Sequence, residues 1–324
     1  MAASKKMRFF ITGGAGFIGS HLSDRLMAEG NEVTVYDNLS LGKKEFVERH
    51  FSSPKFKFVQ ADLLEFDKLK TSMEGSDVVF HLAANSDIIK SAKNPKIDLE
   101  QGTIVTYKVL EAMRANNIKK IVFTSSNVVY GEAVKSPTAE DYGPLLPISF
   151  YGASKLACEA VMGAYCHNFE FNAWIYRFGN IVGKRPTHGV VIDFYGKLKK
   201  NPLVLEVLGD GNQSKPYVEV HDCVDGMLFG LNNSHEQINL FNLGTTGAVY
   251  VKDIADIVVK EMGLKNVKIK FAGGVRGWPG DVHTVRLDVS KLESLGWKPK
   301  YPTSREAFSA GAKDIIEDLK TQDL

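Results

Sequence analysis

Two side chains four residues apart, Tyr151 and Lys155, carry the clearest chemical signal in the sequence. Positions i and i+4 of a helix share a face, so the phenol and the ammonium are expected to point to the same side. A phenol ionises near pH 10, which is too high for a base at neutral pH. At about 4 Å and an effective dielectric near 20, the ammonium favours the phenolate by on the order of 4 kcal/mol, roughly three pKa units. We therefore expect Tyr151 to act as a general base near pH 7, with Ser126 sharing the proton.

A glycine-rich turn near the N-terminus indicates what holds the second reactant. The apolar run at residues 7–12 predicts a buried strand, and Gly14, Gly16 and Gly19 follow it with dinucleotide spacing. Such glycines permit a tight turn, the approach of a pyrophosphate to the backbone, and the packing of helix on strand. Residues 20–30 predict the helix whose positive N-terminus would face the pyrophosphate.

An acidic residue closes the next predicted strand. Residues 33–36 are apolar and end at Asp37, about 20 residues after the glycines. A carboxylate there accepts hydrogen bonds from the adenosine ribose diol and repels a 2′-phosphate, which favours NAD over NADP. Lys43 and Lys44 follow closely, and their positive charges would favour a 2′-phosphate, so NADP stays open as an alternative.

The remaining pattern alternates strands with helices. Residues 56–60, 77–83, 121–124 and 171–177 predict strands, and residues 103–116 predict an amphipathic helix. This alternation predicts an α/β fold of the Rossmann type, a doubly wound parallel sheet. Ligands of such sheets bind beyond the carboxyl ends of the strands. The polar or small residues expected at these ends are Asp37, Asp62, Ala83, Ala84, Ser125, Ser126 and Asn180.

The second half of the chain is denser in proline and glycine. We expect a dinucleotide-binding domain over residues 1–182, which also receives segments near 217–245, and a smaller α/β substrate lobe over residues 183–324. Helices are predicted at 222–231 and 251–262, and residues 241–244 predict a strand that returns to the main sheet. The two lobes are therefore interleaved in the sequence.

Composition excludes several classes of function. The chain has 324 residues, 44% of them hydrophobic and 24% charged, with a formal net charge of +2. Such values are ordinary for a soluble enzyme and give no reason to expect nucleic acid or a membrane as a partner. No run is long and apolar enough to span a bilayer. We expect a cytoplasmic protein.

Cysteines and histidines add no separate site. Three cysteines, without the CxxC spacing, are expected to be reduced and mostly buried. Their positions are Cys158, Cys166 and Cys223. His81, His188 and His221 lack the spacing of a ligand cluster, so we expect structural or substrate-adjacent roles and no metal.

These motifs together resemble the extended short-chain dehydrogenase/reductase family, and within it the UDP-galactose 4-epimerases and related nucleotide-sugar epimerases. The resemblance covers nearly the whole chain. It rests on residues 12–22, 37–40, 81–84, 125–131, 151–155, 177–183, 208–211, 217–222 and 277–282.

The resemblance implies a role for each matching residue. Tyr151 would be the base, Lys155 its electrostatic partner and ribose anchor, and Ser126 the third catalytic residue. The implied NAD contacts are Gly13, Gly16, Phe17, Ile18, Gly19, Asp37, Asn38, Ser40, Gly42, Asp62, Leu63, Leu82, Ala83, Ala84, Ser125, Tyr151 and Lys155. The implied substrate contacts are Ser126, Tyr151, Asn180, Gly189, Val190, Leu205, Val207, Lys215, Arg276 and Asp281.

The implied activity is inversion of C4 of a UDP-hexose, UDP-galactose or UDP-glucose, through a 4-keto intermediate, with NAD regenerated in each cycle. Dehydratases of the superfamily carry an acidic pair where this chain has Asn127 and Val128, which argues against dehydration. Some epimerases have a bulky tyrosine that narrows the sugar pocket where this chain has the smaller Val285. N-acetylated hexoses therefore stay open as substrates. A reductase or decarboxylase acting on a nucleotide sugar is the alternative, and a non-enzymatic NAD sensor is a third.

The resemblance also implies a homodimer. Helices near residues 98–116 and 149–166 would pair with their mates as a four-helix bundle. The sequence does not separate this arrangement from one in which both helices merely pack on the sheet.

Overall fold

The computed structural model describes residues 6–86, 88–274, 276–278 and 280–322. The chain forms two compact units. The first, here the sheet unit, contains the chain up to Ser126, Phe150–Tyr176 and Met227–Phe241. The second unit contains Asn127–Ser149, Arg177–Gly226 and the chain from Asn242 onward. The predicted domains, 1–182 and 183–324, divide the chain by ligand-binding role, which these units do not test, so that division stays a prediction.

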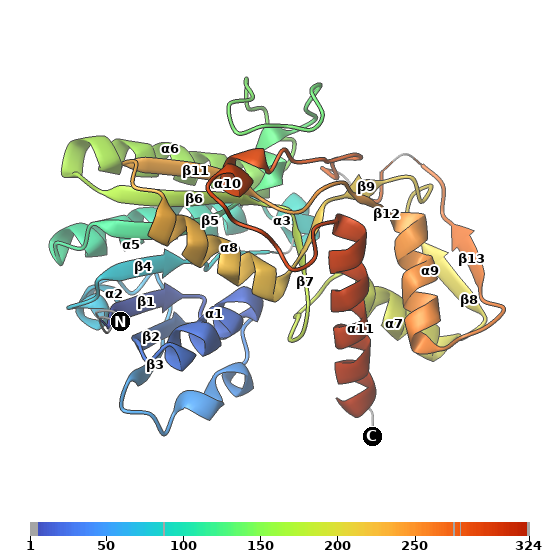
Figure 1. Ribbon diagram of the computed structural model, residues 1–324, viewed down its shortest axis with the longest axis horizontal. Helices are drawn as coiled ribbons and strands as arrows, with labels where there is room; N and C mark the ends of the chain where they lie inside the picture. Colours follow the sequence, from blue (N-terminus) through green and yellow to red (C-terminus); the bar gives the residue numbers. More distant parts are fainter. Residues whose placement is uncertain (1–5, 87, 275, 279, 323–324) are drawn as a thin grey trace. The chain divides into compact units, whose positions relative to one another are not determined.

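A seven-stranded sheet organises the sheet unit, in the order β11-β6-β5-β4-β1-β2-β3 (Figure 1). Its strands are β1 (Arg8–Thr12), β2 (Glu32–Asp37), β3 (Phe56–Gln60), β4 (Val78–His81), β5 (Lys120–Ser126), β6 (Asn172–Phe178) and β11 (Ile238–Leu243). β1 pairs in parallel with β2 and with β4, which brings Thr12 beside both Tyr36 and His81. The predicted α/β parallel sheet is confirmed, and so is the return of a late segment to it as β11.

Helices cover both faces of this sheet. The helices of the unit are α1 (Phe17–Ala28), α2 (Phe66–Met73), α3 (Ile88–Lys93), α4 (Lys96–Asp98), α5 (Val105–Ala115), α6 (Phe150–Phe169) and the second half of α8 (Val220–Asn233). One core joins the sheet to α2, α5 and α6, with Leu69, Val109 and Met162 fully buried in it. On the other face lie α1 and α8, in front of the sheet in Figure 1.

A π-helical turn, η3 (Leu99–Ile104), joins α4 directly to α5. The short 3-10 helices are η1 (Lys44–Phe46), η2 (Glu48–His50) and η4 (Asn127–Tyr130). All four residues of β4 are buried, as expected for a strand covered on both faces of a parallel sheet.

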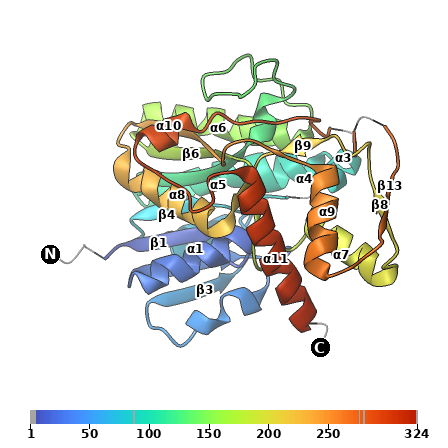
Figure 2. The same ribbon diagram turned by 45° about the vertical axis from the view of Figure 1, so that its right-hand side comes forward.

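The second unit is built from small two-stranded sheets and three long helices. Its strands pair as β7 (Asn180–Val182) with β10 (Tyr217–Glu219), β8 (Val204–Val207) with β13 (Lys268–Phe271), and β9 (Ser214–Lys215) with β12 (Val249–Tyr250). Figures 1 and 2 both show α7 (Val190–Lys200), α9 (Val251–Met262) and α11 (Ser304–Gln322) side by side. The short α10 (Ser290–Ser294) follows β13 along the chain.

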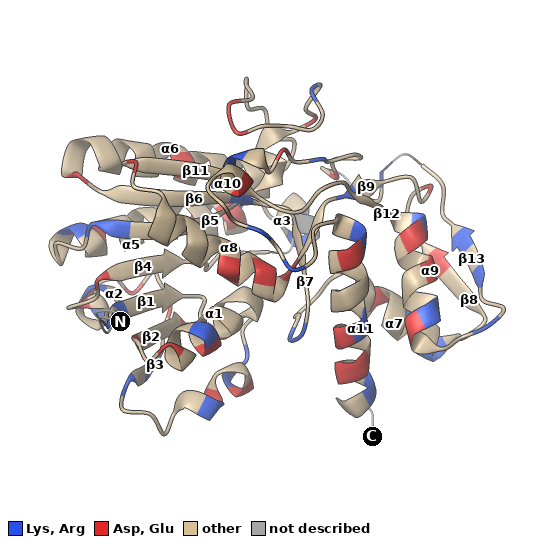
Figure 3. Cartoon of the chain, viewed as in Figure 1, with Lys and Arg blue, Asp and Glu red and all other residues tan. Residues whose placement is uncertain are grey.

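Charged side chains of both signs lie on the long helices of the second unit. Acidic and basic residues both occur along α9 and α11 (Figure 3). Among the described residues, no helix combines the length and the apolar character that a membrane span requires.

Candidate active site

The glycine turn after β1 is a backbone cradle. The Gly13 amide donates to Tyr36 O at 2.9 Å, and the Gly16 amide donates to Gly13 O at 3.1 Å. A Cβ on Gly13 would lie 2.8 Å from Ala83 N, and one on Gly19 would lie 2.3 Å from Gly13 O. Both obstacles are backbone atoms, and Gly13 also has φ +69°. The turn therefore requires glycine at both positions.

Helix α1 begins immediately after this turn. Its N-cap is Gly16, without a side-chain cap, and its first turn, which the structure describes in full, contains no carboxylate. The first amides of an α-helix have no partner within the helix. The amides of Phe17 and Ile18 are therefore suited to an anionic ligand.

Asp37 ends β2 beside the same turn. Its Oδ2 accepts from Ala15 N at 3.0 Å and its Oδ1 accepts from Leu39 N at 2.8 Å. Burial raises the pKa of this carboxyl above its ordinary value. A Cβ on Gly42 would lie 3.0 Å from Asp37 Oδ2, so Gly42 lets the loop close over the carboxylate.

The loops after β2 and β3 are tied together. Asn38 Nδ2 donates to Asp62 Oδ2 at 2.9 Å, and Asn38 Oδ1 accepts from Ser40 N at 3.0 Å. Leu63, next to Asp62, is buried. These residues form one connected wall of the predicted adenosine site.

The two lysines after this loop pack on aromatic rings. Lys43 Nζ lies 5.7 Å from the centre of the Phe46 ring, and Lys44 Nζ lies 5.4 Å from that of Phe51. These contacts hold the two ammonium groups on aromatic rings and do not involve Asp37. The preference for NAD over NADP therefore still rests on the Asp37 carboxylate.

A buried chain of hydrogen bonds joins the loop after β4 to the π-helical turn. Thr106 Oγ1 donates to Gly102 O at 2.7 Å, so it accepts from His81 Nε2, 2.9 Å away. His81 Nδ1 is then an acceptor and receives a hydrogen bond from the Thr12 hydroxyl at 2.7 Å, while Thr12 Oγ1 accepts from Ala83 N at 3.3 Å. Burial, and secondarily the charge of Lys155, lowers the pKa of His81 to about 3. His81 is therefore neutral, with its proton on Nε2; of the structural and substrate-adjacent roles expected for it, these bonds are consistent with the structural one.

The three predicted catalytic residues lie together in the sheet unit. Tyr151 and Lys155 are in the first turns of α6, and Ser126 ends β5. Lys155 Nζ donates to Thr124 O at 2.6 Å and lies 5.7 Å from the centre of the Tyr151 ring. Ser126 hydrogen-bonds the Tyr151 hydroxyl. Ser125 points elsewhere and donates to Glu159.

The charge state of the pair differs from the expectation. Burial lowers the pKa of Lys155 to about 8. The pKa of Tyr151 is raised, first by burial and then by the negative charge of Asp98. The expected fall of the tyrosine pKa is therefore wrong for the chain by itself, because the sequence argument counted Lys155 and left out desolvation and Asp98.

Several predicted substrate residues of the second unit already have polar partners within that unit. Asn180 hydrogen-bonds the Tyr217 hydroxyl. Lys215 Nζ donates to Asp281 Oδ1 at 2.7 Å, and both side chains are largely buried. The Arg276 guanidinium pairs with Glu132. Each predicted diphosphate cation thus carries a carboxylate partner, which reduces its net charge. Pro279, in the predicted motif at 277–282, lies outside the described residues.

The other substrate residues of this unit fall into two kinds. Gly189 is the N-cap of α7, with φ +128°, and Val190 is the first residue of that helix. Leu205 and Val207 are buried in the core of the unit, so they would meet a ligand through backbone atoms only. Leu82 and Ala84, in the sheet unit, lie partly exposed after β4, as the predicted cofactor contacts require.

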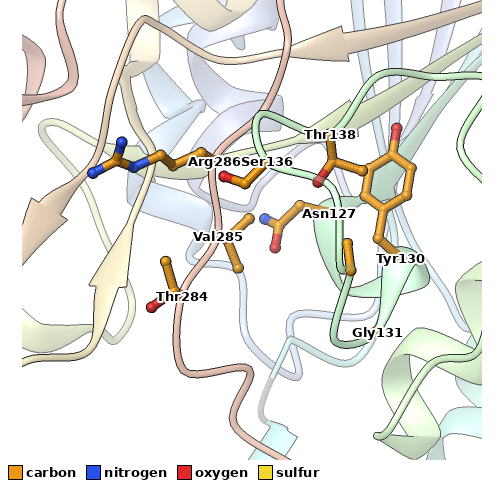
Figure 4. Close-up of a pocket in the computed structure, with 9 residues that line it drawn as sticks. Asn127, Tyr130, Gly131, Ser136, Thr138, Thr284, Val285 and Arg286 are labelled. Carbon is orange, nitrogen blue, oxygen red and sulfur yellow. The ribbon is translucent and has the colours of Figure 1, made fainter.

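One small pocket lies wholly in the second unit (Figure 4). Its lining residues are Asn127, Tyr130, Gly131, Ala133, Ser136, Thr138, Thr284, Val285 and Arg286. Figure 4 shows Asn127 and Val285 facing each other, whereas the Arg286 guanidinium points away from them. Asn127 Nδ2 donates to Phe178 O at 2.6 Å.

Comparison with known proteins identifies the family of this chain. The sequence profile described as "NAD dependent epimerase/dehydratase family" matches residues 9–244. The chain belongs to that family.

Its relatives within the NAD dependent epimerase/dehydratase family differ in reaction. A crystal structure of a UDP-galactose 4-epimerase is 39% identical, with a TM-score of 0.86 over 97% of this chain and 100% of that one. The UDP-glucose 4-epimerase of Mycolicibacterium smegmatis is 32% identical over 98% of this chain and 99% of its own. The UDP-glucuronic acid decarboxylase 4 of Arabidopsis thaliana is 33% identical over 98% of this chain and 69% of its own. The family is therefore established, and the individual reaction is not.

The cofactor of the family fits the residues of the sheet unit. A Cβ would fill the cradle at Gly13 and Gly19, and the first turn of α1 offers amides without a carboxylate nearby. Asp37 stands at the end of β2 where a ribose diol would be bound. NAD is the cofactor of the NAD dependent epimerase/dehydratase family, and these are the residues that would hold it.

The sequence interpretation missed two acids of this site. Glu159 follows Lys155 by four residues, the same i+4 signal that identified the tyrosine and lysine, and it accepts from Ser125. Asp98 is almost completely buried and acts electrostatically on Tyr151 and Lys155. Only the structure could identify Asp98, because it is distant from both in the sequence.

Proposed function

We propose that this enzyme of the NAD dependent epimerase/dehydratase family inverts C4 of a neutral UDP-hexose, UDP-galactose or UDP-glucose. The observation that carries the proposal is the convergence of Tyr151, Lys155 and Ser126 at the carboxyl end of β5, with Tyr151 and Ser126 hydrogen-bonded. The 4-epimerases among the relatives support it.

In this mechanism the residues of the chain transfer a proton to and from the sugar. Bound NAD supplies the acceptor and later the donor of the C4 hydride. Tyr151 takes the proton of the sugar 4-hydroxyl as the hydride leaves C4. It returns this proton to the oxygen when C4 is reduced from the other face. Ser126 holds the sugar oxygen through its hydroxyl, and Lys155 supplies positive charge while its Nζ is fixed on Thr124 O. The net reaction consumes no NAD.

Two features of the second unit argue against other chemistries. The Asn127 amide donates to Phe178 O and is buried, so this position offers no acid for the elimination of water. The pocket beside it contains Val285 and hydroxyl groups, and the Arg286 guanidinium points away. Such a lining suits a neutral sugar better than a uronate.

Decarboxylation of a UDP-uronic acid is the second candidate, because a plant decarboxylase is 33% identical over nearly the whole of this chain. The two candidates separate by product. A decarboxylase converts UDP-glucuronic acid into a UDP-pentose and carbon dioxide, whereas an epimerase leaves the carbon count unchanged.

Proton NMR of the purified protein with UDP-galactose and NAD tests the proposal. We expect UDP-glucose to accumulate up to a constant ratio of the two sugars, approached equally from UDP-glucose, with no net NADH. An unchanged spectrum with UDP-galactose, together with conversion of UDP-glucuronic acid, would contradict the proposal and favour the decarboxylase.

We also propose that the enzyme is a homodimer. Helices α5 and α6 and the π-helical turn before α5 expose several large apolar side chains, together called here the α5–α6 face. They are Leu99, Ile104, Tyr107, Phe150 and Phe169, each 38–55% exposed. Exposed apolar side chains of this size are typical of protein interfaces, and a second copy would bury them.

A further inference from the structure

A buried acid lies next to the proposed catalytic pair without any assigned role. Asp98, at the end of α4, is 3% exposed. Its Oδ1 accepts from Asn85 Nδ2 at 3.0 Å, whereas its Oδ2 has no hydrogen-bond partner among the described residues. A buried carboxylate oxygen without a partner is costly, so its retention needs an explanation.

The backbone places Asp98 against the catalytic helix. Ser154 Oγ donates to Asp98 O at 2.8 Å, and Ser154 stands between Tyr151 and Lys155 on α6. The same serine hydroxyl lies 3.0 Å from Thr103 Oγ1, on the π-helical turn that follows Asp98. These two bonds fix the turn of α6 that carries the tyrosine and the lysine to the end of α4 and to the π-helical turn that follows it.

Several charged or titratable groups surround the pair. Asp98 faces it from α4, Cys158 and Glu159 lie on α6, and His81 approaches from β4. His81 is neutral, and Glu159 accepts a short hydrogen bond from Ser125. Asp98 is the buried carboxylate whose charge acts on both members of the pair: it opposes ionisation of Tyr151 and favours the charged form of Lys155.

We propose that Asp98 is a positioning residue whose negative charge offsets that of Lys155 at Tyr151, so that Tyr151 stays protonated until the oxidised cofactor brings a positive charge into the site. The proposal rests on the proposed function, in which Tyr151 is the base. Because Oδ2 is buried, we expect Asp98 to act through its electric field and not by contact with a ligand. The tyrosine would then be a base beside the oxidised cofactor and an acid beside the reduced one, as the two halves of an epimerisation require.

Asp98→Asn tests the charge at constant shape, because the asparagine oxygen can still accept from Asn85. Ionisation of Tyr151 is followed by the ultraviolet absorption of tyrosinate, with the Tyr151→Phe spectrum subtracted, in protein without cofactor, with NAD and with NADH. We expect Asp98→Asn to lower the Tyr151 pKa in cofactor-free protein by at least about one unit. The acid limb of turnover against pH should move in the same direction. An unchanged Tyr151 titration would overturn the proposal.

Two control variants separate charge from structure. Glu100→Gln removes a half-buried carboxylate two residues away, which pairs with Lys96 at 3.3 Å, and it should leave the Tyr151 titration unchanged. Asn85→Ala removes the hydrogen bond to Asp98 and keeps the charge, so it should not lower the Tyr151 pKa. A fall in Asn85→Ala equal to that in Asp98→Asn would assign the effect to packing and contradict the proposal.

The wild-type protein gives an independent measurement if Asp98→Asn does not fold. Without cofactor, Tyr151 should ionise above the ordinary phenol pKa near 10, and with NAD it should ionise at lower pH than with NADH. Ionisation well below 10 without cofactor would overturn the proposal. Full turnover by Tyr151→Phe would instead contradict the proposed function, and the charge titration would still be readable.

Discussion

At the scale of single residues, the phenol of Tyr151 is the group on which the proposed chemistry depends. Tyr151→Phe removes the hydroxyl and keeps the ring beside Lys155 Nζ, 5.7 Å from its centre. We expect turnover to fall by about 100-fold to 10,000-fold, the usual contribution of a general acid–base, while NAD binding persists. Initial rates with UDP-galactose and a separate NAD titration measure the two effects.

Tyr107→Phe is the matched control, because this tyrosine is 49% exposed on α5. It should retain wild-type turnover. Equal losses in the two variants, or normal turnover in Tyr151→Phe, would remove Tyr151 from the role of base.

His81 gives a prediction about stability and pH. Its pKa in the folded protein is about 3, against 6.5 for an ordinary histidine, so below pH 6.5 the unfolded chain binds a proton that the folded chain refuses. The stability that this residue contributes is complete above pH 6.5 and is lost as the pH falls. The expected loss is about 1.4 kcal/mol per pH unit, or about 2 kcal/mol between pH 6.5 and 5.

Urea unfolding at several pH values checks this dependence. His81→Gln should be less stable at neutral pH, since it loses the bonds to Thr12 and Thr106, but its unfolding free energy should fall less steeply with acid. The exposed His167 supplies the control: His167→Gln should retain the wild-type slope. An identical slope in wild type and His81→Gln would contradict a neutral buried His81.

At the scale of elements, the turn between β1 and α1 permits no side chain at Gly19. A Cβ there would lie 2.3 Å from Gly13 O and 2.7 Å from Gly14 Cα, so Gly19→Ala must displace backbone. We expect a loss of about 1–3 kcal/mol of stability together with weaker NAD binding. Unfolding in urea and NAD titration by intrinsic fluorescence measure both.

Gly196→Ala offers the opposite case, because a Cβ at this position in α7 would meet nothing within 4 Å. Alanine is the better helix former, so this variant should be as stable as wild type or more stable, by up to about 1 kcal/mol. If both variants behaved alike, the difference could not come from the crowding at Gly19.

The elements that the sequence predicted are those with a strong period or a local motif. β3 and α9 have the predicted bounds, and Leu22 and Leu26 of α1 are buried as expected. The π-helical turn Leu99–Ile104 was not predicted, because its extra residue per turn leaves no local signal. The short strand pairs of the second unit were missed for a similar reason, since two to four residues carry no measurable alternation.

The candidate site divides in the same way. The glycine cradle and the Tyr151–Lys155 spacing are local, so the sequence could identify them. The effect of Asp98 depends on a contact between residues more than fifty positions apart, Ser154 and Asp98, which one sequence does not encode locally. The raised pKa of Tyr151 is therefore a property of the fold.

At the scale of the whole molecule, the α5–α6 face predicts the state of association. Tyr107→Glu places a charge among exposed apolar side chains and should shift the protein from a dimer to a monomer. Light scattering after size exclusion measures the mass directly. Val134→Glu, at a side chain that is 94% exposed in the second unit, should leave the mass unchanged. A monomeric wild-type protein would contradict the proposed dimer.

The order of the strands also constrains how the chain is made. β11, the last strand of the seven-stranded sheet to be synthesised, ends at Leu243 and pairs with β6, and the chain passes between the two units five times. At about 5–20 residues per second, a ribosome needs roughly 12–50 s to reach that strand. Until then the outer edge of β6 lacks its neighbour, so a stalled or truncated chain would present an open strand edge on which aggregation can begin.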